Sequence, residues 1–498
     1  MTGESAAVSA SVSVAAAPFA DSADPAPPRS GRPAIVGTGL LLGGLVAVLL
    51  GTFTVGGSEG DPARLPYWYA AGWVLFAAAL LALRKVPRRA ASGLVVAGGV
   101  ALALTGLISA PRTSNDMYRY AWDGRVQAAG VSPYAYPPDA PELRQLREPW
   151  LFPAPAGRRC ADWTDIRTTG GDCTRINRPY VHTIYPPVAE GWFLAVHAVS
   201  PPGTRWKPLQ VGGALLAVAT TGALLLVLRR HGADPRRAAL WAWCPIVPVA
   251  AVNDAHIDAL GVLLTVLALG MARGLPRRGA LLGAAVAVKI LPVLALPGAL
   301  ARRGPRETLR TVLPVLAVIV LAYLPYVLAS GGGVLGYLPG YLKEEGYEPG
   351  GVHRFALLRL VLPDGAAGPT AVAGVLAVAL YTLRRGDPGR PWRGALTVTG
   401  TALLLTSPSY YWYALLIVGL VALDGRWEWL AVPLAGLALY AGDVLGAVPG
   451  GNVLQASAYG AAALVVATGA LARRRARNDA RANACGSTVD TSAPPCRT

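Results

Sequence analysis

The sequence predicts an all-α polytopic membrane protein, and three observations lead to this prediction. Hydrophobic residues make up 53% of the 498 residues and charged residues only 15%. The apolar residues gather in blocks of roughly twenty, the length that a helix needs to cross a hydrocarbon core. Short clusters of Arg and Lys separate these blocks. We therefore expect one bundle of about 12 to 14 transmembrane helices with a large extracytoplasmic first loop, not a series of soluble domains.

The basic clusters indicate how the chain lies in the membrane. A net charge of +17 is compatible with a nucleic-acid partner, but the charges are spread between apolar runs and form no single basic segment. An excess of Lys and Arg in short loops marks the cytoplasmic side. This interpretation predicts a multi-pass protein of the cell membrane with both termini in the cytoplasm. The main clusters are residues 84–89, 229–237, 273–278, 302–310, 384–393 and 473–477.

Composition divides the chain into three parts. Residues 1–33 are rich in Ala, Ser and Pro, lack the basic and apolar start of a signal peptide, and are predicted to be a disordered cytoplasmic segment. Residues 34–472 form the predicted transmembrane domain, with extracytoplasmic loops at 111–187 and 331–354. Residues 473–498 are predicted to be a disordered basic tail on the cytoplasmic side.

The apolar runs place the spans in order. Residues 37–55, 67–83 and 94–110 are the first three, and the third leads into the long polar loop. Residues 188–199 can form a helix that is too short to cross, and 212–228 return the chain to the inside. No internal repeat is visible. The remaining straightforward spans are 311–330, 368–383, 395–406, 411–423, 429–446 and 453–472.

Two apolar runs fit no simple span. The run between the clusters at 229–237 and 273–278 begins and ends at cytoplasmic charges, so the chain must turn near residues 253–258 at the outer side. The run at 279–301 is short and contains Lys289 followed by Pro292. Two half-helices with Lys289 at the bend would satisfy the charge rule, and one unbroken span would not. An intramembrane Lys is typical of a functional site, although it can also reach to an interface.

The loop that opens at residue 111 contains the densest group of polar and aromatic residues. Ser114 or Asn115 can cap a helix that ends near Gly130. On that helix Asp116, Tyr120 and Asp123 fall at positions i, i+4 and i+7, hence on one face. A site-like arrangement is one interpretation. The alternative is that an aspartate only caps the helix, or pairs with Arg119 or Arg125.

Five cysteines are too few for a disulfide framework. Cys160 and Cys173 both lie in the predicted outer loop and could form a bridge there, which would stabilise the fold by about 3 kcal/mol. No cysteine has metal-site spacing, and no metal or other cofactor is predicted. The aspartates at 116, 123, 254 and 258 leave metal dependence open.

The polar groups of the chain gather on the predicted outer side. A site there has no access to soluble nucleotides, so an activated substrate must come with the lipid, such as a polyprenyl-phosphate sugar. Sugar transfer from it needs a carboxylate base for the acceptor hydroxyl, and cations for the departing phosphate. It also needs a cover that excludes water. Asp116, the cations Lys289, His256 and Arg354, and the glycine-rich loop 331–354 fit these three needs.

Several motifs carry a resemblance to a known family. Asn-Asp-Met-Tyr-Arg-Tyr-Ala-Trp-Asp-Gly-Arg followed by Gly-Val-Ser-Pro-Tyr, within residues 115–134, resembles the first-loop motif of GT-C glycosyltransferases. The chain is similar in particular to actinobacterial polyprenol-phosphomannose-dependent mannosyltransferases. Further blocks of that group correspond to residues 183–187, 253–259, 289–292 and 407–413. Two additional spans precede the loop aspartate, which departs from the simplest GT-C layout.

The resemblance implies an inverting transferase that uses a lipid-phosphate hexose, with mannose first among the sugars, and a lipid-linked or cell-envelope glycan as acceptor. Asp116 matches the family's catalytic base. The alternatives are a transporter or flippase of a lipid-linked sugar, or a GT-C enzyme that uses arabinose, glucose or a protein acceptor. For the aromatic run 407–413, an interfacial belt is an equal alternative to a substrate role. The predicted substrate-binding residues are Tyr120, Asp123, Arg125, Tyr185, Asp254, His256, Asp258, Lys289, His353, Arg354, Tyr410 and Tyr411.

Overall fold

The computed structural model confirms an all-α polytopic fold. It describes residues 31–55, 63–155, 160, 165–168, 170–344, 354–444 and 451–486. Within these ranges the only strands are the short antiparallel pair β1 (Ile166–Arg167) and β2 (Cys173–Thr174). The α-helices are α1 (Arg32–Thr54), α2 (Leu65–Leu83), α3 (Arg88–Thr105), α4 (Asp116–Ala128), α5 (Pro187–Val199), α6 (Lys207–Arg230), α7 (Ala239–Ala242), α8 (Asp258–Val266), α9 (Leu275–Val286), α10 (Leu296–Ala299), α11 (Pro305–Ser330), α12 (Leu338–Glu344), α13 (Asp364–Arg385), α14 (Pro391–Thr406), α15 (Leu415–Asp424), α16 (Ala431–Val444) and α17 (Gly451–Gly486).

Fewer helices than expected are long enough to cross a membrane. Within the described ranges six are sufficiently long and apolar, or seven if one bent pair counts as a span. The prediction of about 12 to 14 spans exceeds this number. The difference arises because much of the chain from 235 to 300 and from 391 to 444 consists of short helices, none longer than 16 residues, joined by turns and by 3₁₀ or π segments.

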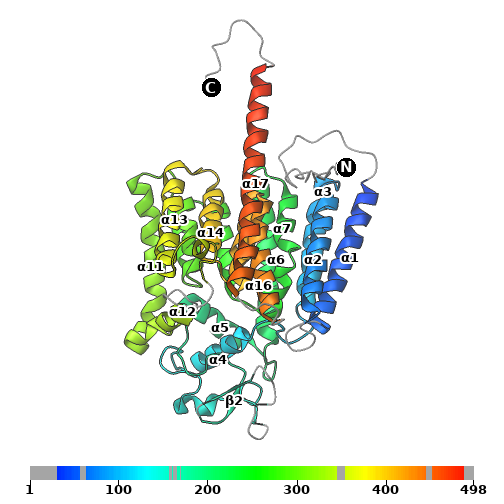
Figure 1. The fold of residues 1–498 in the computed structure, drawn as a ribbon. Helices are drawn as coiled ribbons and strands as arrows, with labels where there is room; N and C mark the ends of the chain where they lie inside the picture. The colour runs from blue at the N-terminus through cyan, green and yellow to red at the C-terminus, as the bar shows by residue number, and fades with distance from the viewer. Residues whose placement is uncertain are drawn as a thin grey trace, which may run out of the picture.

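The helices form a bundle, and the region that contains α4, β1, β2 and α5 (residues 111–199) covers one end of it (Figure 1). This region is called the polar layer below. Helix α1 begins and α17 ends on the upper side of the bundle in this view, whereas α4, α5 and β2 lie below it. Helices α1, α2 and α3 pack together on one flank, and α11, α13 and α14 stand on the other. The long loop therefore lies at the end of the bundle opposite the start of α1.

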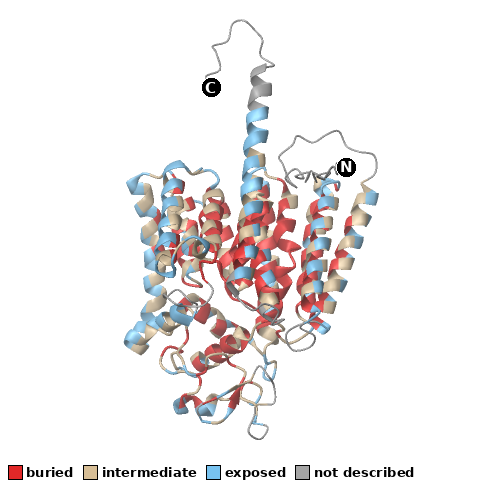
Figure 2. Ribbon diagram, viewed as in Figure 1, coloured by how far each residue is buried: buried red, intermediate tan, exposed pale blue. Residues whose placement is uncertain are grey.

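Burial is greatest in the centre of the bundle (Figure 2). Among the candidate spans α6 is the most buried and α11 the least. A glycine permits the central helices to approach closely: a Cβ on Gly213 of α6 would lie 2.0 Å from the carbonyl oxygen of Ala251. In the same way, a Cβ on Gly279 of α9 would lie 2.1 Å from the carbonyl oxygen of Thr311 on α11. Small residues at such crossings are typical of helix packing in membranes.

The chain breaks at the two places that the basic clusters indicated. The π-helical segment η3 (Val247–Asn253) and the helix that starts at Asp258 are bent by 113°. Ala255, within the bend, has a φ of +50°. The second break lies between α9 and the 3₁₀ segment η5 (Leu291–Ala295), and Lys289 lies in it. The run at 279–301 is thus two helical pieces, not one span.

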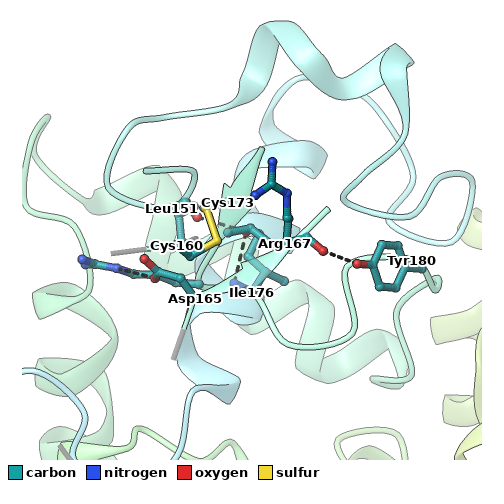
Figure 3. Close-up of a disulfide and its surroundings, with 9 residues drawn as sticks. Leu151, Cys160, Asp165, Arg167, Cys173, Ile176 and Tyr180 are labelled. Carbon is teal, nitrogen blue, oxygen red and sulfur yellow. Dashed lines mark hydrogen bonds and ion pairs between the residues drawn. A yellow bond between two sulfur atoms is a disulfide. The ribbon is translucent and has the colours of Figure 1, made fainter. Parts of the chain in front are cut away.

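A disulfide stabilises the polar layer. Cys160 and Cys173 form a disulfide, as Figure 3 shows. Their Cα atoms lie 5.7 Å apart. The strand pair is held further by the hydroxyl of Tyr180, which donates to the carbonyl oxygen of Arg167. The amide of Arg175 donates to the carbonyl oxygen of Leu151 at 2.9 Å. The predicted outer loop at 111–187 is therefore folded over most of its described residues.

The predicted tail differs from the structure. Helix α17 continues to Gly486, although disorder was predicted from residue 473. The stretch from 472 is rich in Ala and Arg, which have high helix propensity, and this continues the helix beyond its apolar part. The predicted disordered N-terminal segment, apart from its last residues, and residues 487–498 lie outside the described residues.

Candidate functional site

A cavity of about 730 Å³ lies where the polar layer meets the bundle. Residues of α4, of the loop before α5, of the break at Lys289, and of α12, α13 and α14 line it. It brings together five of the residues singled out in the sequence, from positions up to 294 residues apart along the chain: Asp116, Tyr185, Lys289, Arg354 and Tyr410.

Asp116 is the first residue of α4 and faces this cavity. It lies at the N-terminus of the helix, where the first backbone N–H groups carry partial positive charge. The side-chain amide of Asn177 donates a hydrogen bond to its Oδ1. Its Oδ2 lies 3.6 Å from Nδ1 of His256, and 18% of the side chain remains exposed. The carboxylate is therefore oriented on two sides and open on a third.

His256 lies behind the carboxylate and not on the cavity surface. Its ring is fully buried and stacks on Trp412, with ring centroids 4.3 Å apart and 18° between the planes. Among the described residues neither ring nitrogen has a hydrogen-bond partner. The sequence predicted a substrate-binding cation here. The geometry instead makes His256 a neighbour of Asp116 that can orient it or exchange a proton with it.

The charges around the cavity are unequal. Among the described lining residues Asp116 is the only carboxylate, whereas Arg119, Arg178, Lys289 and Arg354 are cationic. Two of these cations have acidic partners that lie off the lining: Arg119 pairs with Asp123, and Lys289 with Asp258. A third, Arg178, pairs with Glu344 of α12. Cationic side chains that can contact an anionic group thus lie in the same cavity as one carboxylate that can act as a base.

Lys289 is held in the cavity wall. Its Nζ lies 2.6 Å from Oδ2 of Asp258 and 4.7 Å from the ring centroid of Tyr413. Asp258 itself is buried and does not line the cavity, so its predicted contact with substrate is replaced by a contact with Lys289. An ammonium fixed by a carboxylate and an aromatic face does not extend to an interface, which argues against the alternative interpretation of this lysine.

Three predicted residues of α4 point away from the cavity. Asp123 is buried and accepts hydrogen bonds from Nε of Arg119, as the alternative interpretation held. Tyr120 stacks on Phe193 of α5 at 4.4 Å, so its ring belongs to the helix contact. Arg125 pairs with Glu148 at 3.1 Å within the polar layer. A shared helical face did not place these groups together because α5 covers the later turns of α4.

Asp254 and Tyr411 also have structural partners. Asp254 is buried and accepts hydrogen bonds from the backbone N–H and the hydroxyl of Thr113. The Tyr411 hydroxyl lies 2.9 Å from that of Thr113, so the three groups form one network that fixes the segment before Asp116. Tyr410, the adjacent residue, does line the cavity. His353 lies outside the described residues.

Tyr185 reaches the cavity from the loop before α5. Its ring contacts that of Tyr120, with centroids 4.9 Å apart. Burial, together with the nearby charge of Asp116, raises the pKa of the Tyr185 phenol well above its usual value. The hydroxyl is therefore neutral and can donate a hydrogen bond to a ligand.

One wall of the cavity is apolar. Val372 and Leu376 of α13 and Ile290 and Val293 near the Lys289 break all line it. These four side chains are also exposed at the surface of the protein. Helix α13 is one of the helices long and apolar enough to cross a membrane. The cavity is thus charged on one side and apolar on the other.

Several functional candidates were not identified from the sequence. Asn177 and Arg178 lie in the same polar loop as the block 183–187, a few residues before it. Arg119 was considered only as a partner of Asp123. Trp412 and Tyr413 lie in the aromatic run, where Tyr410 and Tyr411 were chosen instead. An amide or guanidinium within an aromatic block of a polar loop is the signal that could have identified the first two.

The possible metal ligands are not brought together. No group of three or more His, Cys, Asp or Glu side chains suited to a metal ion occurs in the part of the chain that the structure describes. Asp116, Asp123, Asp254 and Asp258 each have a different partner, respectively Asn177, Arg119, Thr113 and Lys289. The expectation that no cofactor is needed stays a prediction.

The similarity of the chain to a known protein family bears on this site. Residues 183–408 match the model of glycosyltransferase family 87. The match indicates a membrane glycosyltransferase. The matched part contains Tyr185, the bend at 253–258, Lys289 and Arg354, whereas Asp116 precedes it. Neither the curated proteins nor the solved structures give a match. A glycosyltransferase in a bilayer implies a sugar donor and an acceptor, and the cavity is where the structure offers room for them.

Proposed function

We propose that this protein transfers a hexose, with mannose as the first candidate, from a polyprenyl-phosphate donor to a lipid-linked or cell-envelope glycan. The transfer takes place on the extracytoplasmic face and inverts the anomeric centre. Asp116 is the general base. The observation that carries the proposal is the cavity in which one carboxylate faces four cations beside an exposed apolar wall.

The shape of the cavity supports a lipid-phosphate donor. The apolar wall formed by Val372, Leu376 and Ile290 suits a polyprenyl chain that stays in the bilayer. Lys289 and Arg354 suit its phosphate, because cations stabilise the charge that grows on the leaving group. A soluble nucleotide sugar would have no use for the exposed apolar side chains.

The base has the geometry that sugar transfer requires. Asp116 removes the proton from the acceptor hydroxyl as that oxygen attacks the anomeric carbon, and the bond to the phosphate oxygen breaks on the opposite side. Asn177 holds one carboxylate oxygen and leaves the other toward His256 and the cavity. Helix α12 borders the cavity and can exclude water, since Tyr341 on it bonds to Tyr413.

The proposed side of the membrane rests on two features. The basic cluster before α3 and that at the end of α6 are separated from the polar layer by the length of a span. A disulfide bridges Cys160 and Cys173 in that layer. Disulfides persist in oxidising compartments and are rare in the cytosol. Both features favour an extracytoplasmic cavity and cytoplasmic termini.

The test uses membranes that contain the full chain and a radiolabelled polyprenyl-phosphate mannose. Transfer of label to endogenous glycolipid is expected for the wild type and is abolished in Asp116→Asn, which should be produced at normal levels. Parallel reactions with glucose and arabinose donors identify the sugar. Normal transfer by Asp116→Asn would refute the assignment of the base, and no transfer from any polyprenyl-phosphate sugar would refute the donor class.

A further inference from the structure

Arg119 has an unusual environment for a paired arginine. Its side chain is 4% exposed, yet it lines the cavity. Its Nε donates to both oxygens of Asp123, at 2.9 and 3.0 Å, and Nη1 donates to the carbonyl oxygen of Val181 at 3.2 Å. Its Nη2 has no hydrogen-bond partner among the described residues. A buried guanidinium donor beside a cavity is left for a ligand, because an unpaired buried donor is costly.

The partner of Arg119 is itself part of a buried pair. Glu190 of α5 is fully buried and hydrogen-bonded to Asp123. Its oxygens accept from the hydroxyl of Thr183 at 2.8 Å and from the side-chain amide of Gln127 at 2.8 Å. Gln127 in turn accepts from the hydroxyl of Tyr326 on α11 at 2.7 Å. Two carboxyl groups thus lie against one guanidinium.

A single cation cannot neutralise two buried carboxylates. Burial raises the pKa of both Asp123 and Glu190, and the charge of Arg119 offsets only part of this increase in each. The charge of Asp123 raises the pKa of Glu190 further, so we assign the proton of the pair to Glu190. Two phenols lie near Glu190. Burial raises the pKa of Tyr134 in the loop, so this group contributes no charge, and the hydroxyl of Tyr326 on α11 donates to Gln127.

We propose that Arg119 binds an oxygen of the anionic phosphate in the cavity, and that the hydrogen-bonded pair Asp123 and Glu190 positions it. The identity of that phosphate as the lipid donor's rests on the proposed function. Asp123 and Glu190 act through Arg119 and do not touch the ligand. With Glu190 protonated, the buried group of three is neutral, and the Nη2 hydrogens remain available to the phosphate.

The first experiment measures equilibrium binding of undecaprenyl phosphate to the purified full-length protein in detergent. Arg119→Lys is expected to weaken binding by tenfold or more, because one ammonium cannot hold Asp123 and the phosphate at once. The control is Arg144→Lys, an exposed arginine of the same polar layer, which should bind normally. Unchanged affinity in Arg119→Lys would overturn the proposal.

The second experiment tests the positioning pair by pH. Above the raised pKa of Glu190 a second negative charge appears next to Arg119, so the affinity of the wild type for undecaprenyl phosphate should fall as the pH rises. Glu190→Gln has nearly the same shape and can still accept one of the two hydrogen bonds from Thr183 and Gln127, but it cannot ionise. Its affinity for undecaprenyl phosphate should therefore persist to a pH at least one unit higher than that of the wild type. The exposed Glu142→Gln serves as the control. Equal alkaline profiles for wild type and Glu190→Gln would refute the positioning role.

Folding and function are separated in the same series. Thermal unfolding of each variant identifies any that fail to fold. If the Arg119→Lys protein does not fold, Arg119→Gln provides a second test at the same position. Loss of binding in Arg119→Lys without transfer from any sugar donor would retain this inference and defeat the proposed reaction. Transfer by the wild type together with unchanged binding in Arg119→Lys would retain the proposed reaction and defeat this inference.

Discussion

Two aspartates on one helix have opposite environments. Asp116 opens α4 and lines the cavity, and its carboxylate lies beside the amide of Asn177 and the buried imidazole of His256. Asp123, on the same helix, is buried and held by a guanidinium. Asp254 and Asp258 resemble Asp123, since each has its own hydroxyl or cationic partner. A carboxylate without a dedicated cation is available as a base, whereas the paired ones fix the positions of other groups.

The largest effect should come from exchanging these two carboxylates for amides. Asp116→Asn removes the base and should lower kcat by about 10²- to 10⁴-fold. Asp123→Asn should lower kcat by less than about tenfold and act mainly through the KM for the donor, because a positioning pair affects binding. Steady-state transfer assays with varied donor separate the two. Equal losses of kcat in Asp116→Asn and Asp123→Asn would contradict the different roles assigned to the two aspartates.

Lys289 is expected to contribute to donor binding. Lys289→Met should raise the KM for the polyprenyl-phosphate donor by roughly tenfold or more, since a hydrogen bond to a charged group contributes about 1.5–3 kcal/mol. The KM for the acceptor should change little. Lys343→Met, at an exposed position of α12, is the matched control. If the donor dependence of Lys289→Met were that of the wild type, Lys289 would be structural.

Asn177 distinguishes the two aspartates, because it donates a hydrogen bond to Asp116 and not to Asp123 in the described structure. Asn177→Ala removes the hydrogen bond to Oδ1 of Asp116 and should lower kcat by about tenfold, with the donor KM nearly unchanged. Single-turnover rates at saturating donor report this directly. A change confined to the donor KM would show that Asn177 contacts the substrate and does not orient the base.

The smallest effect on the reaction should follow removal of the disulfide. Replacing Cys160 and Cys173 by serine should destabilise the polar layer by about 3 kcal/mol and lower its thermal unfolding temperature. The kcat below that temperature should be retained, because neither cysteine lines the cavity. A large loss of kcat in the folded double variant would mean that this part of the loop contacts substrate.

The sequence predicted the local features of the site well. Ser114, Asn115 and Gly130 indicated the ends of α4 to within about two residues, because caps act over short distances. The spacing of the basic clusters predicted both the bend at 253–258 and the break at Lys289. These features depend on neighbouring residues and on the excess of Lys and Arg in cytoplasmic loops. Both can be recognised in a single sequence.

The partners of the charged residues were harder to predict. The pairing of Asp123 with Arg119 follows from their i, i+4 spacing, which the sequence displays, but only the packing of α5 on α4 brings Glu190 to this pair. Asp254 meets Thr113 across 141 residues of sequence, and Lys289 meets Asp258 across 31. Hydrogen bonds between distant segments depend on the tertiary structure. Hydrophobic periodicity and helix propensity do not predict it.

The central claim is that the Asp116 cavity opens outside the membrane and holds the lipid phosphate. Ser114→Cys places a thiol on its lining, in a chain whose Cys244, Cys485 and Cys496 are serine. In intact cells, a membrane-impermeant maleimide should label this thiol, and undecaprenyl phosphate should slow the labelling. Arg230→Cys, at the basic end of α6, should react only after permeabilisation. Labelling of Ser114→Cys only after permeabilisation, or labelling that the lipid phosphate does not slow, would contradict the account.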